Sequence, residues 1–472
     1  MPLFARQRLR FFTQRASQSA VAWSLAATVL RVCSGLLVLP LMVRKLPSEE
    51  LGLWYVFLSL QGIAGLFDLG FSPAVTRAAG YLWAGAKELK AFGVAVVDSA
   101  DTGAEPNHPL LNELVATMRL YYRFFGISSG LLMLLGGGAW IWIKTQHLPD
   151  AAGLRGCYAL FVLGGFLNAT GDLWPALLSG VNGVRIAQKL LLGAALINFL
   201  AGTFGLLGGL GLWSLVLGNI GSGFFLRTAG RIAFIRMLGA HFEAACSARM
   251  HLVRSLWPTA WRAGLVSLGS YLVLSANTLI CSGFLDLRTT ASYGLSLSVI
   301  ALLTYASTIF TYVKLPLINQ MRALGHRDRI VQLWIQRTRL SIGVFFLGAL
   351  GMVSAGNVVL RTLGAKTEFL PTGELAFLLL IIGLEMHHVL YASLVTSENL
   401  NPFVKPALLS GGATLCLSLL LTPQLGVWGM LLAQGCVQAA YNNWWTVRRG
   451  IRGIGLSWVE YWQRYFRQPI RI

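Results

Sequence analysis

The sequence predicts an all-α membrane protein of about twelve transmembrane helices, with both termini in the cytoplasm. Three observations predict it: the composition, the recurrence of long apolar runs, and the placement of basic residues between those runs. Of the 472 residues, 55% are hydrophobic and 12% are charged, and the mean hydropathy is +0.63. Soluble domains carry about 25% charged residues, so the composition excludes an ordinary soluble protein.

Long apolar runs mark the expected spans, because a bilayer core needs about 20 apolar residues per helix. The run that follows the basic N-terminus is longer than a signal-peptide core of about 7–15 residues, so we expect it to be the first span. The expected spans are 18–43, 51–77, 120–143, 156–180, 187–208, 212–232, 256–283, 290–315, 340–360, 374–397, 404–421 and 425–447.

The basic residues set the orientation. When basic residues close to a span end are counted with the adjacent loop, twenty-nine of the 38 Lys and Arg fall on the side of the N-terminus and seven on the other, while Arg31 and Arg262 lie deeper inside spans. Cytoplasmic loops carry the excess of Lys and Arg, so both termini are predicted to be cytoplasmic. The net charge of +20 therefore reflects membrane topology, and we expect no nucleic-acid partner. Six cysteines without CxxC spacing predict neither a metal site nor a disulfide framework, and no cofactor is expected.

A weak internal echo divides the chain into halves. Residues 46–60 (LPSEELGLWYVFLSL) align without gaps with 285–299 (LDLRTTASYGLSLSV), at an offset of 239 positions. Parallel repeats are typical of transporters, which place the substrate site where the repeats meet. The expected parts are a six-helix lobe over 1–240, a second six-helix lobe over 241–447, and a basic cytoplasmic tail over 448–472 that we expect to form an interfacial helix.

Two motifs carry a resemblance to a known family. In the segment from Arg31 to Arg77, a G-x-W sequence opens the second span and Asp68-Leu69-Gly70 followed by Arg77 closes it; GVNGVRIAQK (180–189) forms a later turn. Both resemble the polysaccharide flippases of the MATE-like superfamily, which serve O-antigen and exopolysaccharide assembly. The chain departs from that pattern at Asn277, where the family would place an acidic residue late in the seventh helix.

The resemblance implies two six-helix lobes around a central cavity that opens alternately to either side. It implies a flippase that is not an enzyme and that moves a polyprenyl-diphosphate-linked oligosaccharide outward across a bacterial inner membrane, driven by an ion gradient. The implied partners are that lipid-linked oligosaccharide, the membrane lipids, and a polysaccharide polymerase with its chain-length machinery.

Charges inside the predicted spans are independent site candidates, because a charge at mid-bilayer costs at least about 2.5–3.5 kcal/mol. Arg31 lies roughly 20 Å from either end of its span. It is expected to bind the diphosphate of the cargo, because guanidinium binds phosphate bidentately; the alternative is an ion pair between helices. Asp68 is a partner for Arg31 or a gate residue, or else it makes a hydrogen bond between helices beside Gly70.

Arg262 lies six positions into its predicted span, beside Trp257 and Trp261. Tryptophan is enriched at membrane–water interfaces, which places this arginine near headgroup level. Arg262 therefore either meets a phosphate at the cytoplasmic gate or extends its side chain to the membrane surface.

Asp172 stands mid-span in the sequence GDLWPALLSG. Pro175 frees a backbone carbonyl one turn earlier, and irregular backbone at membrane depth occurs where it is buried in protein or lines a wet cavity. We therefore expect Asp172 to line a substrate cavity. Trp174 is expected to stack on a sugar ring or, alternatively, to serve in packing.

Glu385 and His388 are the expected ion-coupling pair. Glu385 lies near the middle of the tenth span, and His388 follows at i+3 on the same helix face. In a low-dielectric wall a carboxylate and an imidazole can both exchange protons near neutral pH, as proton coupling requires. The alternative is a neutral hydrogen-bonded cluster that stabilises helix packing.

Other functional classes fit less well. A multidrug or small-solute antiporter coupled to H⁺ or Na⁺, from the same superfamily, would have a more acidic and aromatic cavity, and Arg31 argues against it. A membrane glycosyltransferase or polymerase would need paired carboxylates in a polar loop, and no convincing pair is present. A scaffold without transport activity would leave the intramembrane charges unexplained.

Overall fold

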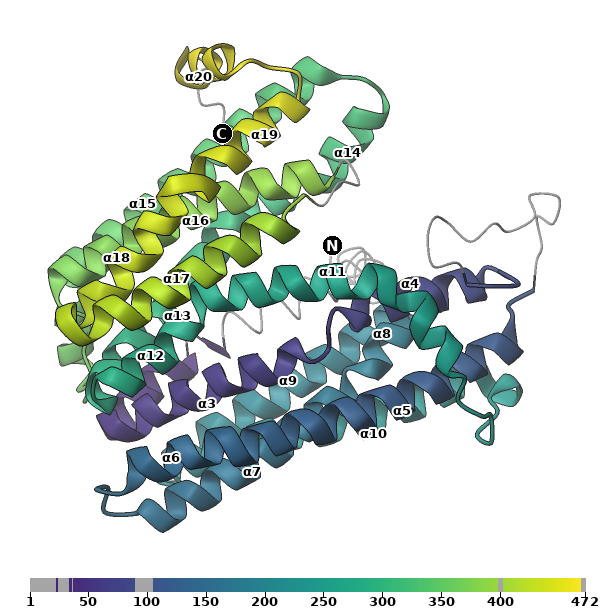
Figure 1. Cartoon of the computed structure of the whole chain (residues 1–472), viewed down its shortest axis with the longest axis horizontal. Coiled ribbons are helices and arrows are strands. Elements are labelled where there is room, and N and C mark those ends of the chain that lie inside the picture. The colour runs from purple at the N-terminus through teal and green to yellow at the C-terminus, as the bar shows by residue number, and fades with distance from the viewer. Residues whose placement is uncertain (1–22, 24–33, 36, 90–104, 398–401, 468–472) are drawn as a thin grey trace, which may run out of the picture. The chain divides into compact units, whose positions relative to one another are not determined.

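The computed structural model of the chain describes residues 23, 34–35, 37–89, 105–397 and 402–467. Across these residues the regular structure is helical (Figure 1). Eight helical runs are long and apolar enough to cross a membrane, or nine if one bent pair counts as a single span. The predicted class, an all-α multi-pass membrane protein, is therefore confirmed within the described residues.

The helices of the first part of the chain lie close to the expected spans. The second expected span is a pair of helices bent by 47°, and a π-helical turn, η1 (Met133–Gly137), interrupts the third. These helices are α3 (Ser48–Leu66), α4 (Phe71–Trp83), α5 (His108–Leu132), α6 (Gly138–Thr145), α7 (Ala151–Gly171), α8 (Leu173–Gly180), α9 (Val184–Leu207) and α10 (Leu212–Leu238).

The second part continues the same pattern. It contains α11 (Met250–Leu274), α12 (Ala276–Phe284), α13 (Leu287–Tyr312), α14 (Leu315–Ala323), α15 (Arg327–Thr362), α16 (Thr372–Thr396), α17 (Val404–Leu425), α18 (Val427–Val437), α19 (Asn443–Gly453) and α20 (Trp458–Arg467). Helices also occupy the expected spans 212–232 and 425–447. The expected span 18–43 lies mostly outside the described residues, so the count of twelve stays a prediction.

Two compact units share the chain. Unit 1 comprises Met1–Leu46 and Leu60–Ser267, and unit 2 comprises Pro47–Ser59 and Leu268–Ile472. The division runs through α3 and α11, so each of these helices contributes residues to both units. The lobe boundary at 240, like the cytoplasmic orientation of the termini, stays a prediction.

Unit 1 is built around α10, which packs along α7 and α9, while α7 also packs on α5 (Figure 1). Glycines allow the close approach of α7 and α10. A Cβ on Gly223 would lie 2.8 Å from the backbone nitrogen of Asn168, and a Cβ on Gly171 would lie 3.1 Å from the nitrogen of Arg227. Small residues serve this purpose in membrane helices, where backbone contact replaces hydrophobic burial as the source of attraction.

Unit 2 brings the two echo segments together. Helices α3 and α13 begin at Ser48 and Leu287, 239 positions apart, which is the offset that the sequence echo gives. Gly52 lies so close to the carbonyl of Leu287 that a Cβ would overlap it. The equivalent stretches of the two halves therefore pack against each other within one unit.

The basic tail contains a short amphipathic helix, α20, which packs on unit 2 through Tyr461, through Arg464, whose Nη1 lies 3.0 Å from Oδ1 of Asp328, and through Tyr465, whose ring centroid lies 4.7 Å from Cζ of Arg339. Tyr461 is buried, and its hydroxyl lies 2.6 Å from that of Tyr391 in α16. The opposite face exposes Val459 (63%) and Phe466 (78%). Such a helix suits an interface with lipid headgroups, and its location there stays a prediction.

Two adjacent glycines of α17 give a matched test of helix packing in unit 2. A Cβ on Gly411 would lie 2.8 Å from the carbonyl oxygen of Gly269, whereas a Cβ on Gly412 would have no atom within 4 Å. We expect Gly411→Ala to destabilise the protein by about 1–3 kcal/mol through overpacking. Gly412→Ala should be neutral or stabilise it by up to about 1 kcal/mol. Melting temperatures in one detergent would check this, and equal shifts for the two variants would contradict the packing.

Candidate functional site

A large cavity lies among the described residues of each unit. The cavity of unit 1 has a volume of about 530 Å³ and that of unit 2 about 580 Å³, both within the usual range of ligand sites, roughly 300–1,000 Å³. Two of the residues singled out from the sequence, Asp68 and Asp172, line the cavity of unit 1, and Glu385 lines that of unit 2.

Asp68 lies in the break between α3 and α4. The chain turns there through two residues with left-handed backbone, Leu69 (φ 49°) and Gly70 (φ 75°). A non-glycine residue with positive φ is uncommon, and Gly70 is also required by space, because a Cβ would lie 2.6 Å from the carbonyl oxygen of Ala260 in α11. The break thus sets Asp68 at the point where the helix axis bends by 47°.

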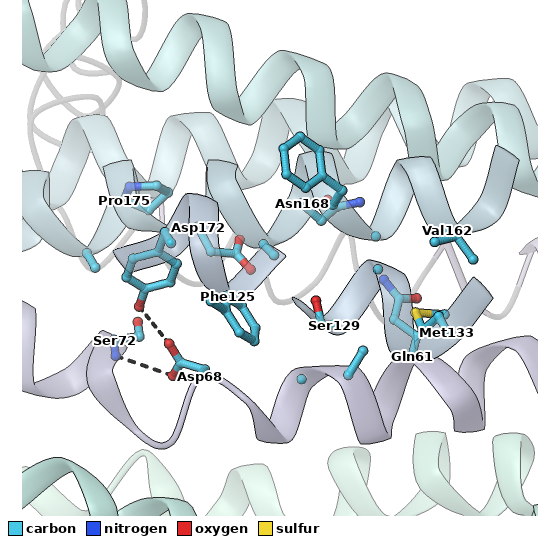
Figure 2. A pocket seen from close by; sticks show the side chains of 18 of the residues that line it. Gln61, Asp68, Ser72, Phe125, Ser129, Met133, Val162, Asn168, Asp172 and Pro175 are labelled. Atoms are coloured by element: carbon cyan, nitrogen blue, oxygen red, sulfur yellow. Dashed lines mark hydrogen bonds between the residues drawn. The ribbon is translucent and has the colours of Figure 1, made fainter. Parts of the chain in front are cut away.

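Hydrogen bonds hold the carboxylate of Asp68 in place. The hydroxyl of Tyr122 in α5 donates to Oδ1 at 2.7 Å, and the backbone nitrogen of Ser72 donates to Oδ2 at 3.3 Å (Figure 2). Tyr121 also donates to the backbone carbonyl of Asp68 at 3.4 Å. The first turn of α4 and Tyr122 of α5 therefore orient this side chain, while Tyr121 holds the backbone of the break.

Asp172 lies at a second helix break, between α7 and α8. Its backbone nitrogen donates to the carbonyl of Asn168 at 2.9 Å, and Pro175, in the first turn of α8, has no N–H to continue the ladder. The side chain is exposed, and Figure 2 shows its carboxylate directed into the cavity, toward the side occupied by Asp68. The irregular backbone expected at this sequence is thus present.

Uncharged polar residues complete the cavity wall, and sequence reasoning did not find them. Asn168 lies one turn before Asp172; its Nδ2 donates to the carbonyls of Gly164 at 2.9 Å and of Asn219 at 3.1 Å. Gln61 and Ser129 lie farther along the same cavity (Figure 2). The sequence did contain a signal for these residues, because a polar side chain inside an apolar span needs a hydrogen-bond partner or a water-filled surface.

The cavity of unit 1 is acidic. Among the described residues that line it, two are carboxylates and none is Lys or Arg. Two like charges that face one space are stabilised by a bound proton, a cation or hydrogen-bond donors. The site is therefore suited chemically to an ammonium group, to sugar hydroxyls, or to a proton or metal cation.

Glu385 and His388 are brought together in α16, as their spacing predicts. Oε2 of Glu385 lies 3.4 Å from Nδ1 of His388, and the two side chains are 14% and 12% exposed. This distance allows an ion pair, but neither atom makes a well-aligned hydrogen bond to another described residue. Tyr55 and Thr308 line the same cavity as Glu385. A coupling role for the pair stays a prediction.

The remaining sequence candidates lie elsewhere. Arg31 falls outside the described residues. Arg262 is exposed on α11, with its Cζ 5.7 Å from the ring centroid of Trp261. Trp174 is 3% exposed and packs against Phe234, with ring centroids 5.8 Å apart. The packing interpretation of Trp174 accords with this burial better than sugar stacking, because little of the ring face is open.

Asn277 occupies the position where the family resemblance leads one to expect an acidic residue. It is fully buried in α12, and its Nδ2 donates to Oε1 of Gln434 in α18 at 3.3 Å. A neutral amide pair thus takes the place of the expected carboxylate. Any ion-binding role of that carboxylate has no counterpart at this position.

No protein-family model matches the sequence, and no curated protein matches it. Solved structures do match the fold. An inward-facing multidrug-resistance MATE-family transporter of the MOP superfamily aligns with a TM-score of 0.60 at 9% identity, over 94% of this chain and 98% of that one. The lipid II flippase MurJ, in an inward closed conformation, aligns with a TM-score of 0.65 at 10% identity, over 94% and 90%.

A third match is the MATE transporter VcmN of Vibrio cholerae, solved as a mutant. Its TM-score is 0.57 at 13% identity, over 97% of this chain and 99% of that one. At such low identity these matches show a shared fold. The chain therefore has the fold of MATE transporters and of the MurJ flippase along nearly its whole length.

Proposed function

We propose that this protein is a flippase that moves a polyprenyl-diphosphate-linked oligosaccharide from the cytoplasmic to the periplasmic leaflet of a bacterial inner membrane. The observation that carries the proposal is the fold shared with the lipid II flippase MurJ, over 94% of this chain and 90% of that one. That protein is named for moving a lipid, which is the class of cargo proposed here.

Broken helices at the cavity support a transport role. Asp68 and Asp172 each lie where a membrane helix is interrupted, and both line one cavity. Transporters build substrate and ion sites from discontinuous helices in this way, because interrupted backbone is tolerated where it lines a cavity. An alternating-access cycle is the mechanism we propose for these elements.

The proposed cargo carries a diphosphate and several sugars, and different residues would recognise each part. Arg31 is the proposed diphosphate ligand on the grounds of its mid-span position. The carboxylates of Asp68 and Asp172 suit sugar hydroxyls, which donate hydrogen bonds to ionised oxygens. Glu385 and His388 are the proposed site of proton coupling in the other unit.

A second candidate function is favoured by the acidic cavity. Two carboxylates lie there with the aromatic rings of Tyr122 and Phe125, and this combination suits a cation with an apolar body. An antiporter that exports multidrug cations in exchange for H⁺ or Na⁺ would use such a cavity. The match to MATE transporters supports this candidate as much as it supports a flippase.

Reconstitution into liposomes separates the two functions. The measurement follows a fluorescent polyprenyl-diphosphate-linked sugar, quenched from outside by an impermeant reductant, in parallel with uptake of a fluorescent cationic dye. A flippase makes the whole lipid pool accessible to quencher and leaves dye uptake at the level of empty liposomes. Dye uptake driven by a pH or sodium gradient, with lipid accessibility fixed at the outer half, would establish the exporter instead.

A further inference from the structure

A small cleft in unit 1 gathers four arginines that the proposed transport cycle does not use. Its volume is about 110 Å³, and its lining includes Arg119 and Arg123 of α5, Arg227 and Arg231 of α10, and the rings of Tyr122 and Trp174. Each arginine pair is spaced i, i+4, which places both side chains on one face of its helix. The two basic faces are therefore turned toward the same small space.

The charges of this arginine cleft are not compensated by carboxylates. Within the described part of the chain, no Asp or Glu forms an ion pair with any of the four guanidinium groups. Arg119 lies within electrostatic range of Arg231 and Arg123. The contact of Arg227 is with a ring, its Cζ lying 5.5 Å from the centroid of Phe166. Like charges at this spacing destabilise a helix, so a bound anion would make the arrangement more favourable.

The cleft lies toward the end of the membrane helix, within reach of lipid phosphates for long side chains. Helix α10 has 27 residues, about 40 Å at 1.5 Å per residue, which exceeds a hydrocarbon core of about 30 Å. Arg231 and Arg227 lie seven and eleven positions before its end at Leu238, roughly 10 and 16 Å from that end. If the excess is shared equally between the two ends, Arg231 and Arg227 lie roughly 5 and 11 Å inside the edge of the core. Long arginine side chains extend from such positions toward the headgroups, here on the side that the basic residues predict to be cytoplasmic.

The size and walls of the cleft limit its ligand. A volume of about 110 Å³ is well below the roughly 300–1,000 Å³ of ordinary ligand sites, so the cleft suits a small group such as phosphate better than an oligosaccharide. Trp174, 3% exposed, forms an apolar wall. Tyr122 lines both this cleft and the acidic cavity, where its hydroxyl donates to Asp68. One side chain thus separates a cationic site from an anionic one.

We propose that the arginine cleft binds the phosphate group of a lipid in the cytoplasmic leaflet. Guanidinium groups bind phosphate oxygens in bidentate pairs and keep their charge at this depth. Two lipids could supply that chemistry, an anionic phospholipid or a polyprenyl diphosphate, and only the second source rests on the proposed function. Binding requires no transport, so failure of this site and failure of the flippase proposal are separate results.

The test measures lipid binding to the purified full-length chain in neutral detergent by native mass spectrometry. The probes are phosphatidylglycerol, polyprenyl diphosphate, inorganic phosphate, and phosphatidylcholine as the zwitterionic reference. We expect an Arg119→Gln/Arg231→Gln double variant to bind the anionic lipids at least about tenfold more weakly, because charge-assisted hydrogen bonds are lost. The matched control, Arg236→Gln/Arg254→Gln, removes two exposed arginines outside the cleft and should bind as the wild type does.

The outcomes assign the source of the phosphate. Tighter binding of polyprenyl diphosphate than of phosphatidylglycerol identifies a carrier lipid, and the reverse order identifies bulk phospholipid. Three results would each overturn the proposal. They are wild-type affinity in the double variant, equal weakening of binding in the control variant, and binding of inorganic phosphate without binding of either anionic lipid.

Stability supplies a second readout. Without lipid, the double variant should melt no lower than the wild type, because a repulsion has been removed. Only the wild type should gain melting temperature when lipid is added. If the double variant does not fold, Arg119→Lys/Arg231→Lys retains the charge but loses the bidentate geometry, and should bind with intermediate affinity. Full wild-type affinity in that lysine variant would overturn the bidentate site.

Discussion

Replacing Asp172 with asparagine is expected to lower the transport rate at least about tenfold while leaving the fold intact. The substitution keeps the size of the side chain but removes the charge that faces the cavity of unit 1. A hydrogen bond to a charged group contributes about 1.5–3 kcal/mol, which corresponds to roughly 10- to 150-fold in affinity. The loss applies whether the cavity binds sugar hydroxyls, an organic cation or a coupling ion. Initial rates in proteoliposomes, normalised to protein content, measure it.

The chain offers a matched control for Asp172 on the same helix. Asp150 caps the start of α7 by accepting a hydrogen bond from the backbone nitrogen of Gly153, and asparagine caps helices equally well. Asp150→Asn should therefore transport at the wild-type rate. If Asp172→Asn is as active as this control, the charge of Asp172 has no part in transport.

Replacing Glu385 with glutamine should abolish the dependence of transport on a pH gradient. The carboxylate lies near the middle of α16, lines the cavity of unit 2 and lies 3.4 Å from Nδ1 of His388. A glutamine cannot exchange a proton, so a cycle that moves a proton through this position would stop or become independent of the gradient. The measurement is the transport rate in proteoliposomes with and without an imposed pH difference.

Glu374 provides the comparison for Glu385. It lies in the first turn of the same helix, eleven positions earlier. Among the described residues, Glu374 is not part of the lining of the unit 2 cavity. Glu374→Gln should keep the full response to the gradient. If the Glu385→Gln variant also keeps its response to the pH gradient, proton coupling at Glu385 and His388 is contradicted. The pair would then serve helix packing, as a neutral hydrogen-bonded cluster.

Hydropathy predicts most of the fold because a bilayer imposes one length on every span. The helices from α5 to α17 lie near the expected runs, since a helix satisfies every backbone group of a span within the span itself. The bend between α3 and α4 was not expected, although Gly70 signals it. Hydropathy averages over about 19 residues, so a break of four residues within an apolar run does not register.

The acidic site is predicted only in part. Asp172 stood out because Pro175 follows it in the same span, and Asp68 because it is a charge in a span. Their shared cavity depends on how α4, α5 and α8 pack, which one sequence does not specify. The four arginines of the cleft were counted only among the cytoplasmic basic residues that set the orientation. The identical i, i+4 spacing in RLYYR (119–123) and RTAGR (227–231) could have marked two basic helix faces.

The most direct test of the proposed flippase is a deletion of this chain in its native host, complemented by the wild type, by Arg31→Ala or by Asp172→Asn, followed by extraction of polyprenyl-linked sugars. A flippase predicts that a complete lipid-linked oligosaccharide accumulates on the cytoplasmic side when the chain is absent. Wild type should reverse that accumulation, and neither variant should. An unchanged pool of lipid-linked sugar together with intact surface glycan would contradict the proposal and leave the exporter as the function to pursue.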